Sequence, residues 1–425
     1  MHSLKVSMQD AVVGVLSVDE DEVYHFTYDA RWVSHGFVIS PHLSFKHSHT
    51  STTVKKFLEN LIPEGDGLDD LIAFAHVAKS NTFAIMHTIG YETAGALVFG
   101  EHSSANKAVF REISPEELTQ RIATMESKSI IIWDKKVRLS LAGIQAKLPL
   151  VIKEGVMGLG DGTLSSTHIM KFQTKKHLHI VVNEFFCMKL AKRLGLDVAS
   201  VVLQRFGEYP VLLVERFDRV YKDDVVQRLH IIDGCQMLDL SSAYKYEQNF
   251  GSSRDVAHVR EGASFKKLFV MTKVCAVPAK AQLTLIQWAM FNLIIGNSDA
   301  HGKNFSFFVD KQGITPTPFY DMLSVMMYDF DHGLAMAYGD VFDPNAIYAF
   351  ELRSFAEEVG ISHKLVAKIL TAQCVKVLKL LEEGVLTSET FTQEESAFIA
   401  KLKGHIRQRA LHFKEVASEM PLVSF

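Results

Sequence analysis

The first hundred residues combine short apolar runs with apolar side chains at helical spacing. Residues 12–16 and 23–28 are apolar and rich in β-branched or aromatic residues, and an acidic turn separates them, so they predict a β-hairpin. Residues 54–61 and 68–78 predict two helices, and residues 93–99 predict a strand that closes the segment. A small mixed unit is therefore expected at the amino terminus.

The pattern changes at about residue 137 to strands separated by small-residue loops. Strands are predicted at 137–140, 148–152, 168–172, 198–206 and 210–217. A helix is predicted at 183–194, and Gly195 supplies its end, because glycine adopts the left-handed conformation at little cost. Another amphipathic helix is predicted at 115–125, in the polar connector before this region.

Beyond about residue 228 the chain is predicted to be mostly helical. Helices are predicted at 264–274, 280–295, 363–381 and 393–412. The whole pattern predicts an α+β protein in three parts. These are an N-terminal subdomain with its connector (1–135), a small sheet-rich lobe (136–227) and a large, mainly helical lobe (228–425).

Composition narrows the class of protein. The chain has 425 residues, 48% of them hydrophobic and 22% charged, which is ordinary for a folded soluble protein of two or three domains. A formal net charge of −4 provides no basic surface for reading DNA directly. The four cysteines form no C-x-x-C pair, and neither a signal peptide nor a membrane-spanning run is evident. A cytoplasmic protein without membrane contact is expected.

The stretch from 291 to 324 is the strongest candidate for chemistry. An apolar helix ends before a polar loop, a strand follows, and a second acid comes after a turn. The polar positions are Asp299, His301, Lys303, Asn304 and Asp321. Phosphoryl transfer needs a carboxylate near the attacking hydroxyl and hard oxygen ligands for Mg²⁺. Asp299 and Asn304 have the D-x-x-x-x-N spacing of a kinase catalytic loop.

This spacing is common by chance, and the alternative is a loop acid that caps a turn. The helix before the loop, the strand after it and Asp321 together favour the catalytic interpretation. Lys171 lies at the end of a predicted strand, and Glu184 lies at the start of the next predicted helix. The pair suits a lysine that binds phosphates and an acid that holds this lysine in place. The alternative is a lysine on an edge strand, exposed to solvent. Residues 143–147 match no Walker loop, but their small side chains and lysine could cover phosphates.

Together these stretches resemble the HipA family of serine/threonine kinase toxins. The resemblance covers nearly the whole chain and implies a two-lobed, protein-kinase-like fold behind an N-terminal subdomain. The matching segments are NLIPEGD (60–66), TAGAL (93–97), SLAGIQAKLPL (140–150), HIMKF (168–172), NEFFCMKLAKRLGL (183–196), VERFDR (214–219), RLHIIDGCQMLDLSSAYKYE (228–247), IIGNSDAHGKNFSFF (294–308) and PFYDMLS (318–324).

The resemblance also implies roles for individual residues. Asp299 would be the catalytic base with His301 beside it, and Asn304 and Asp321 would be Mg²⁺ ligands. ATP contacts are expected from Gly143, Gln145, Lys147, Lys171, Glu215, Phe217, Asp218 and Lys303. Ser140 matches an autophosphorylated serine, where a phosphate would add nearly two negative charges and repel the nucleotide.

The expected function is that of an ATP- and Mg²⁺-dependent serine/threonine protein kinase, the toxin of a bacterial toxin–antitoxin pair. The resemblance implies a HipB-like helix-turn-helix antitoxin as partner, DNA contact only through that antitoxin, and glutamyl-tRNA synthetase as the leading candidate substrate. Two alternatives stay open. One is a catalytically silent co-repressor on the antitoxin–DNA complex, and the other is a lipid or small-molecule kinase that shares D-x-H-x-x-N.

Overall fold

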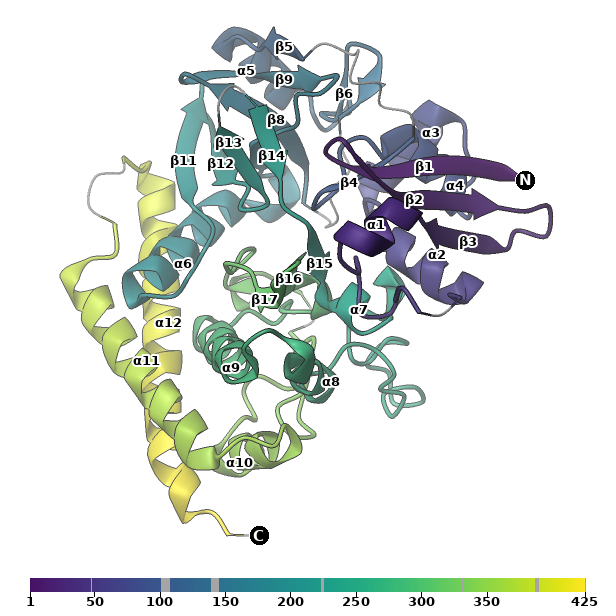
Figure 1. Ribbon diagram of the computed structural model, residues 1–425. Coiled ribbons are helices and arrows are strands. Elements are labelled where there is room, and N and C mark those ends of the chain that lie inside the picture. Colours follow the sequence, from purple (N-terminus) through teal and green to yellow (C-terminus); the bar gives the residue numbers. More distant parts are fainter. Residues whose placement is uncertain are drawn as a thin grey trace. The chain divides into compact units, whose positions relative to one another are not determined.

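The computed structural model describes residues 1–46, 48–100, 108–138, 145–222, 225–330, 332–386 and 390–424 (Figure 1). The chain divides into two compact units, each built from separate stretches. Unit 1 comprises residues 1–176, 204–242 and 307–314, and unit 2 comprises residues 177–203, 243–306 and 315–425. The three-part domain division expected from the sequence is continuous along the chain, and it stays a prediction.

Unit 1 begins with a four-stranded antiparallel sheet in the order β3-β2-β1-β4. Its strands are β1 (His2–Met8), β2 (Ala11–Val18), β3 (Tyr24–Tyr28) and β4 (Leu97–Phe99). The predicted hairpin is confirmed as β2–β3, in which Leu16 pairs with Phe26. The central strand β1 was not predicted, although Leu4 and Val6 alternate with polar neighbours and are buried.

Four helices lie between β3 and β4 in the sequence. They are α1 (Ala30–His35), α2 (Ser51–Glu59), α3 (Asp66–Ala75) and α4 (Thr82–Ile89). The two predicted helices are confirmed as α2 and α3. Helix α2 begins where the Thr50 side chain accepts a hydrogen bond from the backbone N–H of Thr53, which satisfies one of the unpaired donors at a helix start.

The second sheet of unit 1 has six strands in the order β11-β12-β10-β8-β9-β5. They are β5 (Val109–Glu112), β8 (Lys147–Lys153), β9 (Val156–Asp161), β10 (His168–Phe172), β11 (Val201–Phe206) and β12 (Tyr209–Glu215). Strand β10 pairs antiparallel with both β8 and β12, so it lies inside the sheet. Helix α5 (Pro115–Ala123) packs on β12. The strands predicted at 148–152, 168–172, 198–206 and 210–217 are thereby confirmed.

Shorter elements complete unit 1. They are the hairpins β6 (Ile132–Trp133) with β7 (Lys136–Val137) and β13 (Arg219–Lys222) with β14 (Val225–Arg228), the strand β15 (Ile231–Asp233) and the helix α7 (Gly234–Met237). Strand β15 joins a three-stranded sheet with β16 (Ser306–Asp310) and β17 (Gly313–Pro316), in the order β15-β16-β17.

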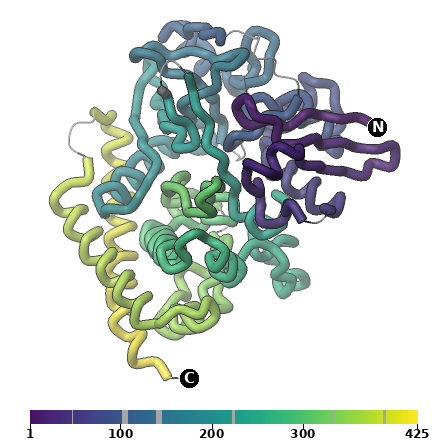
Figure 2. Tube along the Cα trace, in the orientation of Figure 1, coloured from purple at the N-terminus to yellow at the C-terminus, as the bar shows by residue number. Residues whose placement is uncertain are grey.

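Unit 2 is mainly helical. Its α-helices are α6 (Ile180–Leu194), α8 (Phe265–Met271), α9 (Pro278–Ile295), α10 (Ala349–Glu358), α11 (His363–Glu383) and α12 (Gln393–Glu419). Helices α11 and α12 lie side by side and both pack on α6 and α9 (Figure 2). Helix α9 is buried on nearly all sides of its second half, which makes it the central helix of this unit. The predicted helical character of the C-terminal region is confirmed.

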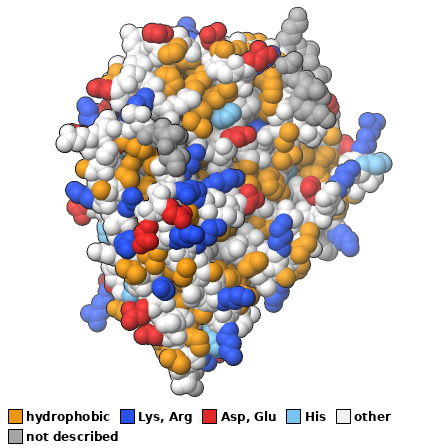
Figure 3. All heavy atoms as spheres, turned by 90° about the vertical axis from the view of Figure 1, so that its left-hand side faces the viewer, with side chains coloured by type: hydrophobic (Ala, Val, Ile, Leu, Met, Phe, Trp, Pro, Cys, Tyr) orange, Lys and Arg blue, Asp and Glu red, His pale blue; other side chains and the backbone are white. Residues whose placement is uncertain are grey.

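The surface agrees with the near-neutral composition. On the face drawn in Figure 3, acidic and basic side chains are interspersed with apolar ones. No helix among the described residues is both long and apolar enough to cross a lipid bilayer.

Candidate active site

The loop that carries Asp299 begins at the C-terminal end of α9. Gly296 ends this helix in the left-handed conformation, with φ of 70°. The Arg409 guanidinium from α12 donates two hydrogen bonds to the carbonyl of Leu293, at 3.0 and 2.8 Å. A cation at a helix C-terminus satisfies carbonyls that have no partner within the helix. The start of the loop is therefore fixed by a glycine conformation and by an arginine from a distant helix.

Residues 299–304 fold back on themselves. The backbone N–H of His301 donates to the Asp299 carbonyl at 2.8 Å, and the Asn304 side-chain Nδ2 donates to the same carbonyl at 3.1 Å. Residues Gly302–Asn304 form a single 3-10 turn. His301 and Asn304 are each only 6% exposed, whereas Asp299 is half-buried. The spacing predicted from the sequence thus brings Asp299 and Asn304 together within one loop.

His301 sits in a buried and positively charged environment. Burial lowers the pKa of His301 well below its usual value, Lys245 and Lys303 lower it further, and Asp321 opposes them. The ring is therefore neutral at neutral pH. Its Nδ1 atom is buried without a hydrogen-bond partner among the described residues. His301 lies beside Asp299, as expected, and acts there as a neutral group.

Asp321 lies at the start of a segment that is tied to this loop. The preceding residue, Tyr320, donates its hydroxyl to the Lys303 carbonyl at 2.6 Å and lies 2.6 Å from the Ser306 hydroxyl. Asp321 itself has φ of 56°, which is uncommon for a residue other than glycine and recurs at functional sites. The Tyr320 side chain therefore links the segment that carries Asp321 to the loop that carries Lys303 and Asn304.

Helix α6 holds the other end of the same segment. The Asn183 side chain donates from Nδ2 to the Ser324 carbonyl at 2.9 Å and accepts from the Ser324 N–H at 2.9 Å. Both residues are fully buried. This pair of bonds fixes the backbone three residues beyond Asp321. Glu184, the neighbour of Asn183, is also buried, and its proposed pairing with Lys171 stays a prediction.

In unit 1, two expected phosphate-binding lysines lie directly opposite each other. Lys147 on β8 pairs in register with Lys171 on β10, and each is 8% exposed. Opposed residues on paired strands project to the same face of a sheet, where like charges repel. Gln145 lies just before Lys147, and its Nε2 donates to the Phe172 carbonyl at 3.0 Å. The structure therefore brings Gln145, Lys147 and Lys171 together at one place on the sheet.

Glu215 ends strand β12, and its register partner on β10 is His168. Lys171 is three residues along β10 from that point, about 10 Å at about 3.3 Å per residue. Glu215 is exposed, and Phe217 is half-buried with its ring edge-on to Phe308, 6.0 Å between centroids. The expected adenine-binding and phosphate-binding residues thus lie toward opposite ends of the same strand pair.

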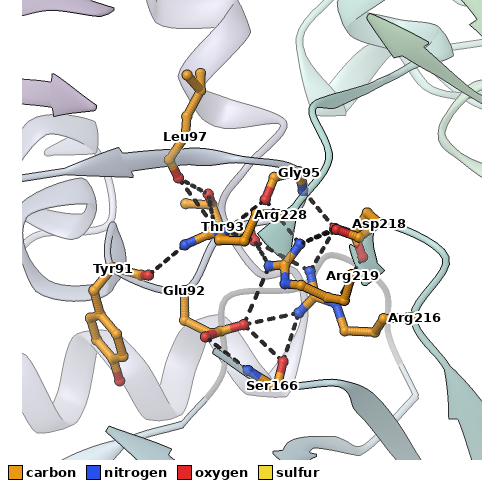
Figure 4. A network of polar contacts seen from close by, with 10 residues as sticks. All are labelled: Tyr91, Glu92, Thr93, Gly95, Leu97, Ser166, Arg216, Asp218, Arg219 and Arg228. Carbon is orange, nitrogen blue, oxygen red and sulfur yellow. Dashed lines mark hydrogen bonds and ion pairs between the residues drawn. The ribbon is translucent and has the colours of Figure 1, made fainter. Parts of the chain in front are cut away.

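Asp218 occupies a different environment from the one expected. Its carboxylate accepts hydrogen bonds from Arg216 at 2.9 and 2.8 Å, from Arg219 at 2.6 Å and from the Gly95 N–H at 2.8 Å (Figure 4). Only 4% of Asp218 is exposed. Both of its oxygens are engaged inside unit 1, so Asp218 forms a structural ion pair there, and the nucleotide contact expected for it stays a prediction.

Figure 4 shows that this ion pair belongs to a larger buried network. The Glu92 carboxylate accepts hydrogen bonds from Arg216 at 3.1 Å, from Arg219 at 3.4 Å and from the Ser166 hydroxyl at 2.8 Å. Arg228 donates to the carbonyls of Tyr91, Thr93, Gly95 and Leu97. We call Glu92, Arg216, Asp218, Arg219 and Arg228 the arginine network.

The arginine network holds three cations and two anions. Burial works to raise the pKa of Asp218, but Arg216 and Arg219 outweigh it and leave the pKa lowered; the same balance, led by Arg219, lowers the pKa of Glu92. Burial lowers the pKa of Arg228 to about 9. Buried charges of this kind persist only when they are paired. The network therefore joins the segment around residues 91–97 to the strands that follow Glu215.

Two of the expected positions, Ser140 and Gly143, lie outside the described residues. Sequence reasoning missed the role of Tyr246, whose hydroxyl donates to Asp299 Oδ1 at 2.6 Å. It also missed the arginine network. The signals were present as YKYE (244–247) and as the arginines of VERFDR, but neither pattern indicates which acid each side chain meets.

Comparison with known proteins identifies the family. The model of the HipA N-terminal domain matches residues 4–100, and the model of the HipA-like C-terminal domain matches residues 139–381, which is more than half of the chain. The chain belongs to the HipA family. Glu92 and Gly95 fall within the N-terminal family domain, and the three arginines and Asp218 fall within the C-terminal one. The arginine network therefore connects these two domains.

Two relatives and a solved structure match most of the chain. The serine/threonine-protein kinase toxin HipA of Shewanella oneidensis is 42% identical over 98% of this chain and 97% of its own. The putative kinase Y4mE of Sinorhizobium fredii is 31% identical over 87% of this chain and 88% of its own. The Shewanella oneidensis HipA solved with HipB and operator DNA superposes with a TM-score of 0.92 at 41% identity, covering 99% of this chain and 100% of that one. The expected α+β, HipA-like kinase fold is confirmed.

Proposed function

We propose that this HipA-family protein is an ATP- and Mg²⁺-dependent serine/threonine protein kinase and the toxin of a toxin–antitoxin pair. The observation that carries the proposal is the loop of unit 2 in which Asn304 bonds to the Asp299 carbonyl and Tyr320 holds the Asp321 segment against Lys303. The kinase name of the 42%-identical relative supports the same reading.

The oxygen donors in this loop suit Mg²⁺, which prefers one or two carboxylates together with phosphate oxygens and water. Asn304 donates its Nδ2 hydrogen to the Asp299 carbonyl at 3.1 Å, an orientation that turns its Oδ1 the other way. Asn304 Oδ1 and the Asp321 carboxylate would hold the ion. Bound there, Mg²⁺ would neutralise charge on the β- and γ-phosphates.

The lysines of unit 1 suit a polyanionic substrate. Lys147 and Lys171 are buried and directly opposed on paired strands, and two lysines on one face of a sheet suit the phosphates of ATP. Glu215 and Phe217 lie toward the other end of the strand pair, where we place the adenine. Gln145 and Gly143 would belong to the loop that covers the phosphates.

In the proposed reaction, Asp299 orients the substrate hydroxyl and accepts its proton. The hydroxyl oxygen forms a bond to the γ-phosphorus as the bond between that phosphorus and the bridging oxygen of ADP breaks. Lys303, which is buried in the same loop, would offset charge on the transferred phosphoryl group. Because His301 is neutral, it would support the loop without competing for the proton.

Three finer proposals follow from the family membership. Ser140 would be autophosphorylated and would silence the kinase by repelling ATP. A HipB-like antitoxin would bind the chain and carry it to DNA, as in the structure of the Shewanella oneidensis complex. Glutamyl-tRNA synthetase is the first substrate to test, and a cytoplasmic location would follow from it.

The decisive experiment is incubation of the purified chain with radiolabelled ATP, Mg²⁺ and glutamyl-tRNA synthetase, beside Asp299→Ala. Label on the synthetase or on the chain itself, absent from the variant, is expected. An unlabelled wild type that still forms a complex with antitoxin and DNA would overturn the kinase proposal in favour of a silent co-repressor. Phosphoproteomics after induction tests the acceptor, because a lipid kinase would leave no dominant new phosphoserine.

A further inference from the structure

A short backbone segment, Lys245–Glu247, runs beside the catalytic loop in unit 2. The Gly302 N–H donates to the Lys245 carbonyl at 2.9 Å, and the Glu247 N–H donates to the Ala335 carbonyl at 2.9 Å. The Glu247 carboxylate also accepts from the Ala337 N–H at 2.9 Å. The segment is therefore bonded on one side to the catalytic loop and on the other to residues 335–337.

Close packing fixes the same segment from behind. A Cβ atom added to Gly262 would lie 1.7 Å from the Tyr246 carbonyl oxygen, so only glycine fits this position. The Gly262 N–H donates to the Glu247 carbonyl. Arg260, two residues earlier, pairs with the Glu247 carboxylate at 2.5 Å. Tyr246 thus projects from a backbone that is held on three sides.

The side chain of Tyr246 reaches the proposed base. Its hydroxyl donates a 2.6 Å hydrogen bond to Asp299 Oδ1, and its ring lies edge-on to the His301 ring with centroids 5.3 Å apart. The Lys245 ammonium lies 5.4 Å from the centre of the Tyr246 ring. A 2.6 Å O–H···O contact is short, as is usual when the acceptor is charged. The phenol therefore fixes the position of one carboxylate oxygen.

We propose that Tyr246 is a positioning residue for phosphoryl transfer, which holds Asp299 in the orientation that receives the substrate hydroxyl. The inference rests on the kinase function proposed above and assigns this residue a part in it. With Oδ1 fixed by Tyr246, the carboxylate keeps one rotamer while substrate binds. A catalytic group held in place before the reaction saves the cost of ordering it during the reaction.

The role predicts a specific kinetic pattern. Tyr246 bonds to the base, so its hydroxyl is expected to contribute to the chemical step rather than to nucleotide affinity.

The test compares Tyr246→Phe with Tyr244→Phe, a matched removal of one hydroxyl two residues away on the same stretch. Tyr244 has no hydroxyl contact among the described residues. Initial rates of label transfer from ATP are measured on glutamyl-tRNA synthetase or, if it accepts no label, on the chain itself. We expect Tyr246→Phe to lower kcat about 3- to 10-fold, the size expected for one lost hydrogen bond, with the KM for ATP within about 2-fold of wild type.

Each outcome decides the point. If the wild type is active and the kcat of Tyr246→Phe is unchanged, the inference is overturned but the proposed function stands. A higher kcat for Tyr246→Phe would also overturn it, because the hydroxyl would then hinder Asp299. An equal loss in both variants would assign the effect to the fold of the segment and would also overturn it. A wild type without transfer activity would overturn the proposed function, and this inference with it.

Discussion

Two regions of the molecule hold aspartates in opposite ways. In unit 1, Asp218 is buried and accepts hydrogen bonds from two guanidinium groups and a backbone N–H. In unit 2, Asp299 and Asp321 are half-buried, and Asp299 meets the neutral hydroxyl of Tyr246. The first arrangement engages both oxygens of the carboxylate, and the second leaves the acid accessible to solvent and ligands.

The difference separates an acid that supports the fold from acids that can perform chemistry. A carboxylate between arginines is held ionised, and removing it leaves cations buried without compensation. A carboxylate held by a tyrosine hydroxyl keeps a fixed position without a permanent cationic partner in that contact. The same residue type therefore has two predicted mutational signatures, loss of stability in the arginine network and loss of activity in the catalytic loop.

The largest predicted effect is on activity, for Asp299→Asn. The amide keeps the size of the side chain and an oxygen for the Tyr246 hydroxyl, but it accepts no proton. We expect the rate of label transfer from ATP to fall about 10²- to 10⁴-fold. Thermal unfolding should match the wild type, because Asp299 is half-buried and its loop is held by backbone contacts. Activity within 10-fold of the wild type would show that Asp299 is not the base.

The complementary variant, Asp218→Asn, should lose stability. It leaves Arg216, Arg219 and Arg228 buried with Glu92 as the remaining acid, and breaking a buried pair costs about 3–5 kcal/mol. The unfolding midpoint in urea is the measurement, with Asp299→Asn as the isosteric control in unit 2. An unchanged midpoint for Asp218→Asn would contradict the structural role that the arginine network assigns to this residue.

A third prediction concerns His230, a buried histidine of unit 1. The Nε2–H of His230 in unit 1 donates to the Ile39 carbonyl at 2.8 Å, and burial lowers the pKa of His230 from 6.5 to about 4. Below pH 6.5 the unfolded chain binds a proton that folded His230 refuses, so stability falls as the pH decreases toward 4. The loss from this residue reaches about 3 kcal/mol below that pH.

The measurement is the urea midpoint between pH 7 and pH 4.5 for wild type and His230→Gln. Glutamine keeps an N–H for the Ile39 carbonyl and does not titrate, so the variant should lose less stability on acidification. His301, whose pKa is also lowered, is unchanged in both proteins and contributes equally. Parallel pH profiles would show that His230 does not contribute to acid sensitivity.

Much of the fold follows from periodicity, and the exceptions have physical causes. Helix α6 and its stop at Gly195, and the strands β8, β10 and β12, were predicted because their apolar patterns are strong. Strand β1 was missed because HSLKVSM has few apolar residues and becomes a strand through pairing with β2 and β4. The pairing with β2 is a local hairpin, but the pairing with β4 joins residues about 90 positions apart and leaves a weak trace in the sequence.

In the candidate site too, contacts between residues close in the sequence could be predicted and contacts between distant residues could not. Asp299 and Asn304 are five positions apart, so a local pattern could predict their contact, and the structure joins them through one carbonyl. The arginine network could not be predicted, because Asp218 and its partner Gly95 are 123 positions apart and the sequence VERFDR does not show where the arginines point. The Tyr246–Asp299 bond also joins distant positions, 53 residues apart. Contacts of this kind depend on tertiary packing.

The smallest predicted effect concerns the geometry of the catalytic loop, at Gly296. With φ of 70°, alanine there costs about 1–2 kcal/mol, and its Cβ would lie 2.9 Å from His405 Nε2 and 3.1 Å from Met326 Sδ. The matched control is Gly195→Ala, at another left-handed helix end of unit 2, where the nearest atom is Lys376 Nζ at 3.6 Å. Both variants should lower the unfolding midpoint by similar amounts. Only Gly296→Ala should also slow label transfer, by a few-fold, because it displaces the residues that lead into Asp299; equal activities would mean that the loop tolerates movement at its start.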